Sequence, residues 1–254
     1  MKVFITGNSS FFSKLLSKSS KNIEILDIKS STNRKSEEML FDLGFLNQVK
    51  NDSFIVHSAW NMETREENAS RKININGSIN FFNSLDEKLK ERFIFVSSVG
   101  AHRDAVSTYG KHKYEVEEHI IKNNGLILKC GLLINEQDPF SEGFFSDLYK
   151  LANKVPIIPN FSGINRIYQI TNTNNIKKSF ENFEYEKNSK VRINYCFNEE
   201  KYSFKELVRN VMKLNKPIIN VPWFIGYYTA RLFEILQINF QIKSDSLLGI
   251  KEIK

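Results

Sequence analysis

Three residues in the middle of the chain have the types and the spacing of an acid–base site. Tyr109 and Lys113 are four residues apart, so a helix would place both side chains on one face. An ammonium close to a phenol lowers the pKa of the phenol, which can then exchange a proton with a hydroxyl or a ketone. Ser98 follows an apolar run, and a serine at the end of a parallel strand points into the crevice where ligands bind. We therefore predict Tyr109 as the acid/base, Lys113 as its electrostatic partner and Ser98 as a hydrogen-bond donor to the reacting oxygen. The alternative is a surface pair of Tyr109 and Lys113 on an amphipathic helix.

A second candidate site is the turn after the first apolar run, with the sequence Thr-Gly-Asn-Ser-Ser-Phe-Phe-Ser from Thr6 to Ser13. A dinucleotide-binding turn needs small residues, because the backbone must approach a pyrophosphate and a helix must point its N-terminus at it. Gly7 is present, whereas Ser10 and Ser13 stand where two further glycines would be. We expect their Cβ atoms to crowd the turn and their hydroxyls to compensate by donating hydrogen bonds to the pyrophosphate. A plain strand-to-helix turn is the alternative.

Two acidic residues follow at the spacing expected for the rest of a dinucleotide site. Asp27 ends the second apolar run, where an acid accepts hydrogen bonds from the adenosine ribose and favours NAD over NADP. Asp42, after the third run, could hold the adenine amino group. Lys29 and Arg34 lie nearby and would soften the preference for NAD.

These residues need a doubly wound parallel sheet to bring them together. Apolar runs alternate with helical patterns in the first half of the chain, which is typical of a Rossmann-type α/β fold with helices on both faces of the sheet. We expect residues 3–5 near the centre of the sheet. We assign 1–134 to the dinucleotide-binding domain and 135–254 to a small α/β substrate lobe, with 166–183 returning to the Rossmann sheet. Strands are expected at 3–5, 23–26, 39–41, 53–56, 93–96, 126–128, 166–170 and 191–196; helices at 11–17, 64–85, 108–122, 144–152, 174–183, from 203 and at 223–236.

Composition narrows the class of protein. The chain has 254 residues, a net charge of +7 and two cysteines within apolar stretches, so we expect a cytoplasmic protein without a disulfide framework. Its start has no signal-peptide pattern, and 221–236 is too short to span a bilayer. The aromatic helix at 223–236 packs on the small lobe or lies on a membrane surface. The histidines have no zinc-ligand spacing, so we expect no metal. No basic run is interleaved with aromatics, so we expect no nucleic acid partner, although the positive charge leaves that reading as an alternative.

Taken in order along the chain, these motifs resemble the extended short-chain dehydrogenase/reductase family, the NAD-dependent epimerases and dehydratases of sugar-nucleotide metabolism. The chain departs from the family in the two serines of the first turn, in short stretches at 98–109 and 135–166, and in Lys129, which replaces an arginine. It also resembles the short-loop branch of the superfamily, some members of which bind cofactor without turnover. The matching segments are Thr6-Gly7, Asp27, Asp42-Leu43, His57-Ser58-Ala59, Asn74 to Ser78, Ser97-Ser98, Tyr109 with Lys113, Leu128 to Gly131, Arg166 to Ile170 and Ser203 to Leu214.

The resemblance implies an enzyme that acts on a nucleotide-linked sugar, or on a sugar with a similar anionic carrier, in surface-polysaccharide or sugar-nucleotide biosynthesis. It implies NAD as cofactor, with NADP less favoured, and a homodimer formed by the helices from 64 and from 108. Arg166 and Ser98 would contact the substrate. A non-catalytic dinucleotide-binding or regulatory protein of the same fold is the runner-up. The residues expected to contact the cofactor are Gly7, Asn8, Ser9, Ser10, Phe11, Phe12, Asp27, Asp42, Leu43, Ser58, Ala59, Trp60, Asn74, Ser97, Tyr109, Lys113 and Cys130.

Overall fold

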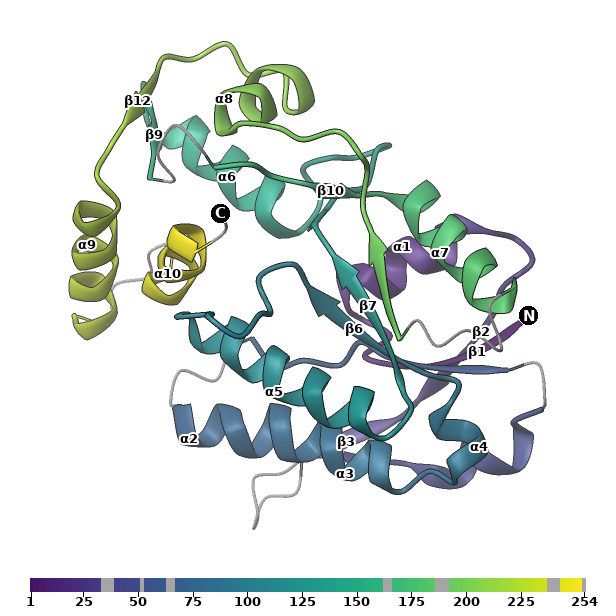
Figure 1. Ribbon diagram of the computed structural model, residues 1–254. Helices are drawn as coiled ribbons and strands as arrows, with labels where there is room; N and C mark the ends of the chain where they lie inside the picture. Colours follow the sequence, from purple (N-terminus) through teal and green to yellow (C-terminus); the bar gives the residue numbers. More distant parts are fainter. Residues whose placement is uncertain are drawn as a thin grey trace.

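The computed structural model describes residues 1–32, 39–50, 53–62, 67–161, 166–185, 192–236 and 243–252. A six-stranded, fully parallel sheet lies at the centre, in the order β11-β7-β6-β5-β1-β2 (Figure 1). The predicted Rossmann-type α/β class is therefore confirmed. The strands are β1 (Lys2–Thr6), β2 (Glu24–Ile28), β5 (Phe54–His57), β6 (Phe93–Ser98), β7 (Leu126–Cys130) and β11 (Ile193–Cys196).

The central strands are apolar along their whole length because helices cover both faces of the sheet. On β1, Val3 and Ile5 point to one face and pack in a core with α1 (Phe11–Ser19) and α7 (Thr173–Tyr185). Phe4 points to the other face, toward α3 (Gly77–Asn83) and α5 (Thr108–Lys122). Both cores are closed, since all three β1 residues are at most 1% exposed.

The position of β1 in the sheet differs from the prediction. It lies next to the edge strand β2 and not near the centre. The third apolar run forms β4 (Met39–Phe41), which pairs antiparallel with β3 (Ser30–Thr32) in a separate two-stranded sheet. Residues 39–41 therefore pair with the residues that follow β2, and β2 stays the edge strand of the main sheet. The 3-10 helix η1 (Leu43–Gln48) comes next.

The long helix expected at 64–85 consists of α2 (Glu67–Ser70), the π-helical turn η2 (Arg71–Asn76) and α3. Residues 63–66 lie outside the described part of the chain. The short helix α4 (Glu87–Lys90) follows, and α5 begins at the predicted residue, with Ser107 as its N-cap. The π-helical turn is notable because such turns are frequent at functional sites.

The second lobe is built around its own core, formed by α6 (Gly143–Lys154), the turn α8 (Phe204–Glu206) and the π-helical η3 (Leu207–Val211). A capping box of Ser203 and Glu206 starts α8, where the sequence predicts a helix from 203. Two short parallel pairs complete the lobe: β8 (Leu132–Leu133) with β10 (Ile170–Thr171), and β9 (Ile158–Asn160) with β12 (Ile218–Asn220).

The chain returns from this lobe to the Rossmann layer at α7, which packs on α1. The strand that extends the main sheet is β11, beside β7, and not the segment 166–170 expected from the sequence. The reason is that β10 is already paired with β8, while a bridge between Tyr168 and Tyr202 holds the preceding residues in the lobe.

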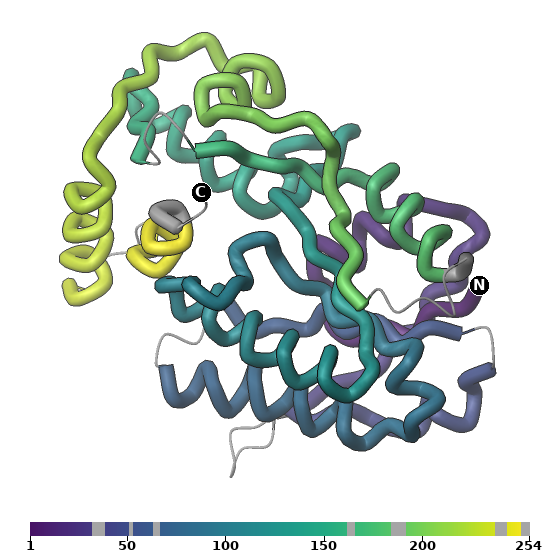
Figure 2. The backbone as a smooth tube through the Cα atoms, in the orientation of Figure 1, coloured from purple at the N-terminus to yellow at the C-terminus, as the bar shows by residue number. Residues whose placement is uncertain are grey.

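Two helices end the described chain, α9 (Trp223–Ile235) and α10 (Ser244–Glu252). Figure 2 traces the chain from α8 outward along α9 and back through α10, which contacts the start of α5. No described helix has the length and apolarity needed to cross a bilayer. One side of α9 packs on α10, and its large exposed apolar side chains are Phe224, Ile225, Tyr228, Leu232 and Ile235, continued by Leu236.

Candidate functional site

The turn between β1 and α1 requires a glycine at its first position. Gly7 has φ +72°, in the left-handed region that side chains disfavour. A Cβ at this position would also lie 2.7 Å from the Cα and the backbone nitrogen of Ala59, which follows β5. The backbones of the two strand ends therefore approach each other as closely as a glycine allows.

Three serines hold this turn together. The Oγ atoms of Ser10, Ser13 and Ser58 lie within 2.9–3.0 Å of one another. Ser13 donates to the carbonyl of Gly7 at 2.8 Å, and Ser58 donates to the carbonyl of Thr6 at 2.7 Å. The hydroxyls of Ser13 and Ser58 thus satisfy the turn itself. In this arrangement Ser13 donates to the Gly7 carbonyl, and not to a pyrophosphate as the sequence led us to expect.

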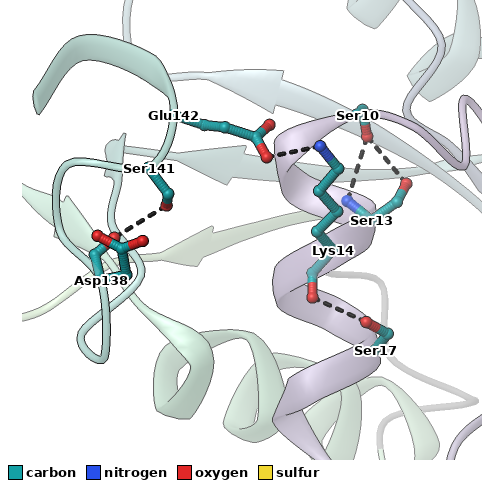
Figure 3. Close-up of polar contacts among 7 residues, drawn as sticks. All are labelled: Ser10, Ser13, Lys14, Ser17, Asp138, Ser141 and Glu142. Carbon is teal, nitrogen blue, oxygen red and sulfur yellow. Dashed lines mark hydrogen bonds and ion pairs between the residues drawn. The ribbon is translucent and has the colours of Figure 1, made fainter. Parts of the chain in front are cut away.

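The first turn of α1 remains suited to an anion. Ser10 is the N-cap, and its Oγ accepts from the amide of Ser13 at 3.1 Å (Figure 3). The first four amides of a helix have no intrahelical partner, so this cap leaves those of Phe11 and Phe12 for a ligand or water. Together with the close approach at Gly7, these amides fit the pyrophosphate of a dinucleotide.

A carboxylate from the second lobe stands beside this helix start. Glu142, directly before α6, forms an ion pair with Lys14 of α1, with 2.5 Å between Oε1 and Nζ (Figure 3). The next residue, Gly143, has φ +71°, and a Cβ there would lie 3.2 Å from the ring of Phe11. Charge and close packing thus fix the loop before α6 against α1. Sequence reasoning missed this contact, because 128 residues separate Lys14 from Glu142.

The acidic residues chosen from the sequence occupy different roles. Asp27 is exposed on β2 and pairs with Ile5 of β1, so its carboxylate is open to solvent near the predicted site. Asp42 is an N-cap, and its Oδ1 accepts from the amide of Gly44 at 2.8 Å. Leu43 is 38% exposed in the same turn. Within the described part of the chain, Asp42 is the one of the two acids whose carboxylate accepts from a nearby backbone amide.

The residues after β5 line the space between the turn and α5. The ring of Trp60 meets the ring of Tyr109 edge to face, with 6.0 Å between centroids. Asn74, in the π-helical turn, donates to the carbonyl of Asn61 at 3.0 Å and accepts from its amide at 2.7 Å. Asn74 therefore connects the loop that contains Trp60 and Asn61 to η2, which is a structural role.

His57 is a buried, neutral residue. Burial and the neighbouring Lys113 lower the pKa of its imidazole to about 3. Nδ1 lies 2.7 Å from Thr6 Oγ1 and Nε2 lies 2.9 Å from Ser78 Oγ, which itself donates to the Asn74 carbonyl. Because the Ser78 hydroxyl donates to the Asn74 carbonyl, it accepts a hydrogen bond from His57 Nε2. The other ring nitrogen, Nδ1, then accepts from the Thr6 hydroxyl. His57 is thus held in the core as a neutral imidazole by two hydrogen bonds.

The structure brings Ser98 and Tyr109 together. Ser98 ends β6, and its hydroxyl interacts with the phenol at the start of α5 closely enough to oppose the rise in the pKa of Tyr109. Burial is the larger effect, and the thiol of Cys130 adds to it, so the pKa of the phenol is raised above its usual value of 10. Ser97 is buried behind the pair and faces away from it toward Glu117.

Lys113 lies one turn along α5 from Tyr109, as predicted, but its ammonium points inward. Nζ donates to the carbonyl of Val96 at 2.7 Å and lies 4.1 Å from the ring centroid of Trp60 and 4.5 Å from that of Phe95. Its distance to the Tyr109 ring centroid is 5.9 Å. Burial lowers the pKa of Lys113 to about 7. The expected lowering of the phenol pKa by Lys113 is therefore absent from this arrangement, in which the rings and the Val96 carbonyl hold the ammonium.

Arg166 sits at the end of the site that faces the C-terminal helices. It is 7% exposed, its guanidinium lies 5.0 Å from the Tyr168 ring centroid, and it donates to the carbonyl of Gly249 at 3.1 Å. Asp245, on the same helix α10, accepts from the amides of Thr108 and Tyr109 at 2.7 and 3.2 Å. Helix α10 therefore joins the predicted substrate arginine to the start of α5. The sequence carried no signal for Asp245.

Cys130 lies behind the site at the end of β7, directly opposite Cys196 of β11. Both are buried free thiols, and the neighbouring Cys196 together with burial raises the pKa of Cys130. Among the residues that the structure describes, no group of three histidine, cysteine or acidic side chains gathers as a metal site.

No protein-family model and no curated protein matches the chain, so the relationships come from solved structures. One is the dTDP-4-dehydrorhamnose reductase of Bacillus anthracis in complex with NADP, with a TM-score of 0.63 and 13% identity over 97% of this chain and 96% of that one. Another is MoeE5 in complex with UDP-glucose and NAD, with a TM-score of 0.62 and 14% identity over 87% and 85%. A UDP-galactose 4-epimerase aligns with a TM-score of 0.57 and 14% identity over 99% and 97%. These likenesses establish the fold of the chain over nearly its whole length.

Proposed function

We propose that the chain is a nicotinamide-dependent reductase, epimerase or dehydratase of the extended short-chain dehydrogenase/reductase type, acting on a sugar with an anionic carrier. One observation carries the proposal. Ser98 ends β6 and Tyr109 stands at the start of α5, near enough for the Ser98 hydroxyl to act on the pKa of the phenol, with Lys113 one helical turn further along α5. This group lies at the same edge of the sheet as the Gly7 turn, where α/β folds bind their ligands.

In this proposal Tyr109 exchanges a proton with the substrate oxygen, and Ser98 donates a hydrogen bond to the same oxygen. Lys113 supplies positive charge beneath the phenol and anchors the ribose. A bound nicotinamide would supply or accept the hydride.

The proposed cofactor is NAD. Its pyrophosphate would meet the amides of Phe11 and Phe12, and Asp27 would accept hydrogen bonds from the adenosine ribose. The exposed carboxylate of Asp27 disfavours a 2′-phosphate, which is the reason to place NAD ahead of NADP. The structural neighbours include complexes with either cofactor, so Asp27 carries this choice.

The proposed substrate is a sugar linked to a nucleotide diphosphate or to a similar anionic group, within sugar-nucleotide or surface-polysaccharide biosynthesis. Arg166 is the cation offered to that group. Similar solved structures include enzymes named for dTDP- and UDP-sugars, which supports this substrate class. We further propose a cytoplasmic homodimer formed through α2–α3 and α5, with α9 available for contact with a membrane surface.

The test is turnover by Tyr109→Phe on a panel of dTDP-, UDP- and GDP-linked sugars. We expect this variant to lose at least about a hundredfold in kcat, the usual contribution of a general acid–base, while binding NAD as the wild type does. Tyr114→Phe is the matched control, since it removes the same hydroxyl from the same helix outside the site. Equal turnover by the wild type and Tyr109→Phe would reject the assignment.

A second candidate, a non-catalytic dinucleotide-binding protein, is favoured by a specific observation. The pKa of Tyr109 is raised and Lys113 is bonded to the Val96 carbonyl, so neither is set for proton transfer in this arrangement. This candidate requires NAD binding without turnover of any sugar in the panel, by the wild type as well as by the variant.

A further inference from the structure

A buried ion pair lies behind the proposed catalytic residues. Oε2 of Glu117 on α5 lies 2.9 Å from Nζ of Lys129 on β7, and these side chains are 2% and 11% exposed. Burying two charges costs desolvation free energy that their attraction repays only in part, so such a pair is weak evidence for stability alone. Its position suggests another role.

The pair connects the elements that carry the site. Glu117 is one turn beyond Lys113 on the buried face of α5. Lys129 lies opposite Ser97 in the register of β6 and β7, and its Nζ also donates to the carbonyl of Ala101 at 2.5 Å. Ala101 belongs to the turn that follows Ser98, and its amide binds the Ser98 carbonyl. The pair therefore fixes α5 and the Ser98 turn to the same strand.

The charge of Glu117 acts on Lys113. Among the described residues, four titratable groups face Lys113: Tyr109 and Glu117 on α5, His57 on β5 and Cys130 on β7. The charged residue next to Cys130 on β7 is Lys129, which acts on Glu117. Burial lowers the pKa of Lys113, whereas Cys130 and Glu117 raise it. Burial raises the pKa of Glu117, while Ser97 and Lys129 lower it. Lys129 thus helps to keep Glu117 ionised, and Glu117 in turn favours the ammonium of Lys113.

We propose that Glu117 is a positioning residue for Lys113: its ion pair with Lys129 fixes a carboxylate one helical turn behind Lys113 and so maintains the Lys113 ammonium at the Val96 carbonyl, one helical turn from Tyr109. The inference rests on the role proposed for Lys113 in catalysis. Its physical content, an electrostatic dependence of Lys113 on Glu117, can be measured without any substrate.

The experiment follows the Lys113 side chain by NMR in protein labelled with [13Cε]lysine. The Lys113 signal is assigned by its loss in Lys113→Met, and its titration is recorded against pH. We expect a wild-type midpoint near the pKa of about 7 and a midpoint lower by about one pH unit in Glu117→Gln. Glu118→Gln, which removes the same charge from the exposed neighbouring position, and Lys129→Arg, which keeps the pair, should leave the midpoint unchanged.

A merely structural role is separated by a double variant. Glu117→Gln leaves Lys129 buried without its partner, so its Tm should fall, whereas Glu117→Gln/Lys129→Met removes both charges and should recover much of that Tm. The Lys113 midpoint should stay low in the double variant. The inference would be overturned if the Lys113 midpoint in the double variant returned to its wild-type value together with Tm. It would also be overturned if the midpoint in Glu117→Gln equalled that of the wild type. If the midpoint moves but no variant or wild type turns over a sugar nucleotide, the coupling of Glu117 to Lys113 stands and the proposed function fails.

Discussion

The Glu142 carboxylate lies 2.5 Å from the ammonium of Lys14 and so fixes the start of α6 against the first turns of α1 (Figure 3). This ion pair places a negative charge of the second lobe beside the helix N-terminus proposed to hold a pyrophosphate. Both side chains are more than a third exposed, so the pair itself contributes little to the free energy of folding.

Glu142→Gln should therefore tighten NAD binding while leaving Tm nearly unchanged. Removing a carboxylate near the pyrophosphate relieves repulsion and frees Lys14, an effect of about two- to fivefold in Kd for a half-exposed charge. Calorimetric titration at two salt concentrations measures it, and the gain should shrink at high salt. Asp147→Asn, on the outer surface of α6, is the matched control. Weaker binding by Glu142→Gln would show that the carboxylate supports the cofactor.

Gly7→Ala should destabilise the protein more than the same change elsewhere. The positive φ and the 2.7 Å approach to Ala59 together predict a loss of about 2 kcal/mol or more in the free energy of unfolding. At Gly100 a Cβ would meet its nearest atom, Ser98 Oγ, at 3.6 Å, so Gly100→Ala should cost far less. Urea unfolding of both variants measures the difference, and equal losses would contradict the geometry of the turn.

Below neutral pH, His57 should make the free energy of unfolding fall as the pH falls. Its folded pKa of about 3 lies below the unfolded value of 6.5, so between these pH values the unfolded chain binds a proton that the folded protein does not. Stability from this group is thus present above pH 6.5 and lost as pH falls toward 3, with a slope approaching about 1.4 kcal/mol per pH unit. Urea unfolding from pH 7 to pH 4 should give a shallower slope in His57→Gln. Parallel slopes would mean that His57 is protonated in the folded protein.

Arg166→Ala should affect both binding and the docking of α10. Loss of the bond to the Gly249 carbonyl should lower Tm, and loss of the guanidinium should raise KM for a diphosphate-linked sugar about tenfold or more. Asp245→Asn loosens the other contact of α10, with Thr108 and Tyr109, without touching Arg166. If Arg166 binds the substrate, its variant should raise KM well beyond Asp245→Asn at a similar loss of Tm. Equal KM values for the two variants would leave Arg166 as an anchor of α10 alone.

The sequence allowed most strands of the sheet and helix α5 to be predicted because their signals are local. Apolar runs such as 93–96 identify buried strands, and Ser107 with the periodicity after it marks α5 at its observed start. The third run, 39–41, forms the predicted strand, but three residues do not specify a partner, and the structure pairs this strand antiparallel with β3 outside the main sheet. The returning strand was placed at 166–170 for the same reason, whereas β11 takes that position.

At the site, the prediction gave residue identities but not side-chain directions. The spacing of Tyr109 and Lys113 fixes them on one face of α5, yet the inward turn of the Lys113 ammonium depends on Trp60 in the loop after β5 and on Phe95 of β6. The link from Asp245 to α5 spans 137 residues, and no local pattern encodes such a contact.

Calorimetric titration of the purified protein with NAD and NADP measures whether the Gly7 turn holds a nicotinamide dinucleotide. We expect NAD to bind, more tightly than NADP, because the Asp27 carboxylate disfavours a 2′-phosphate. Asp27→Asn should reduce that difference, and Glu24→Gln, on the same strand, should not. Tighter binding of NADP by the wild type would contradict the role of Asp27, and no binding of either nucleotide at millimolar concentration would contradict the cofactor site itself.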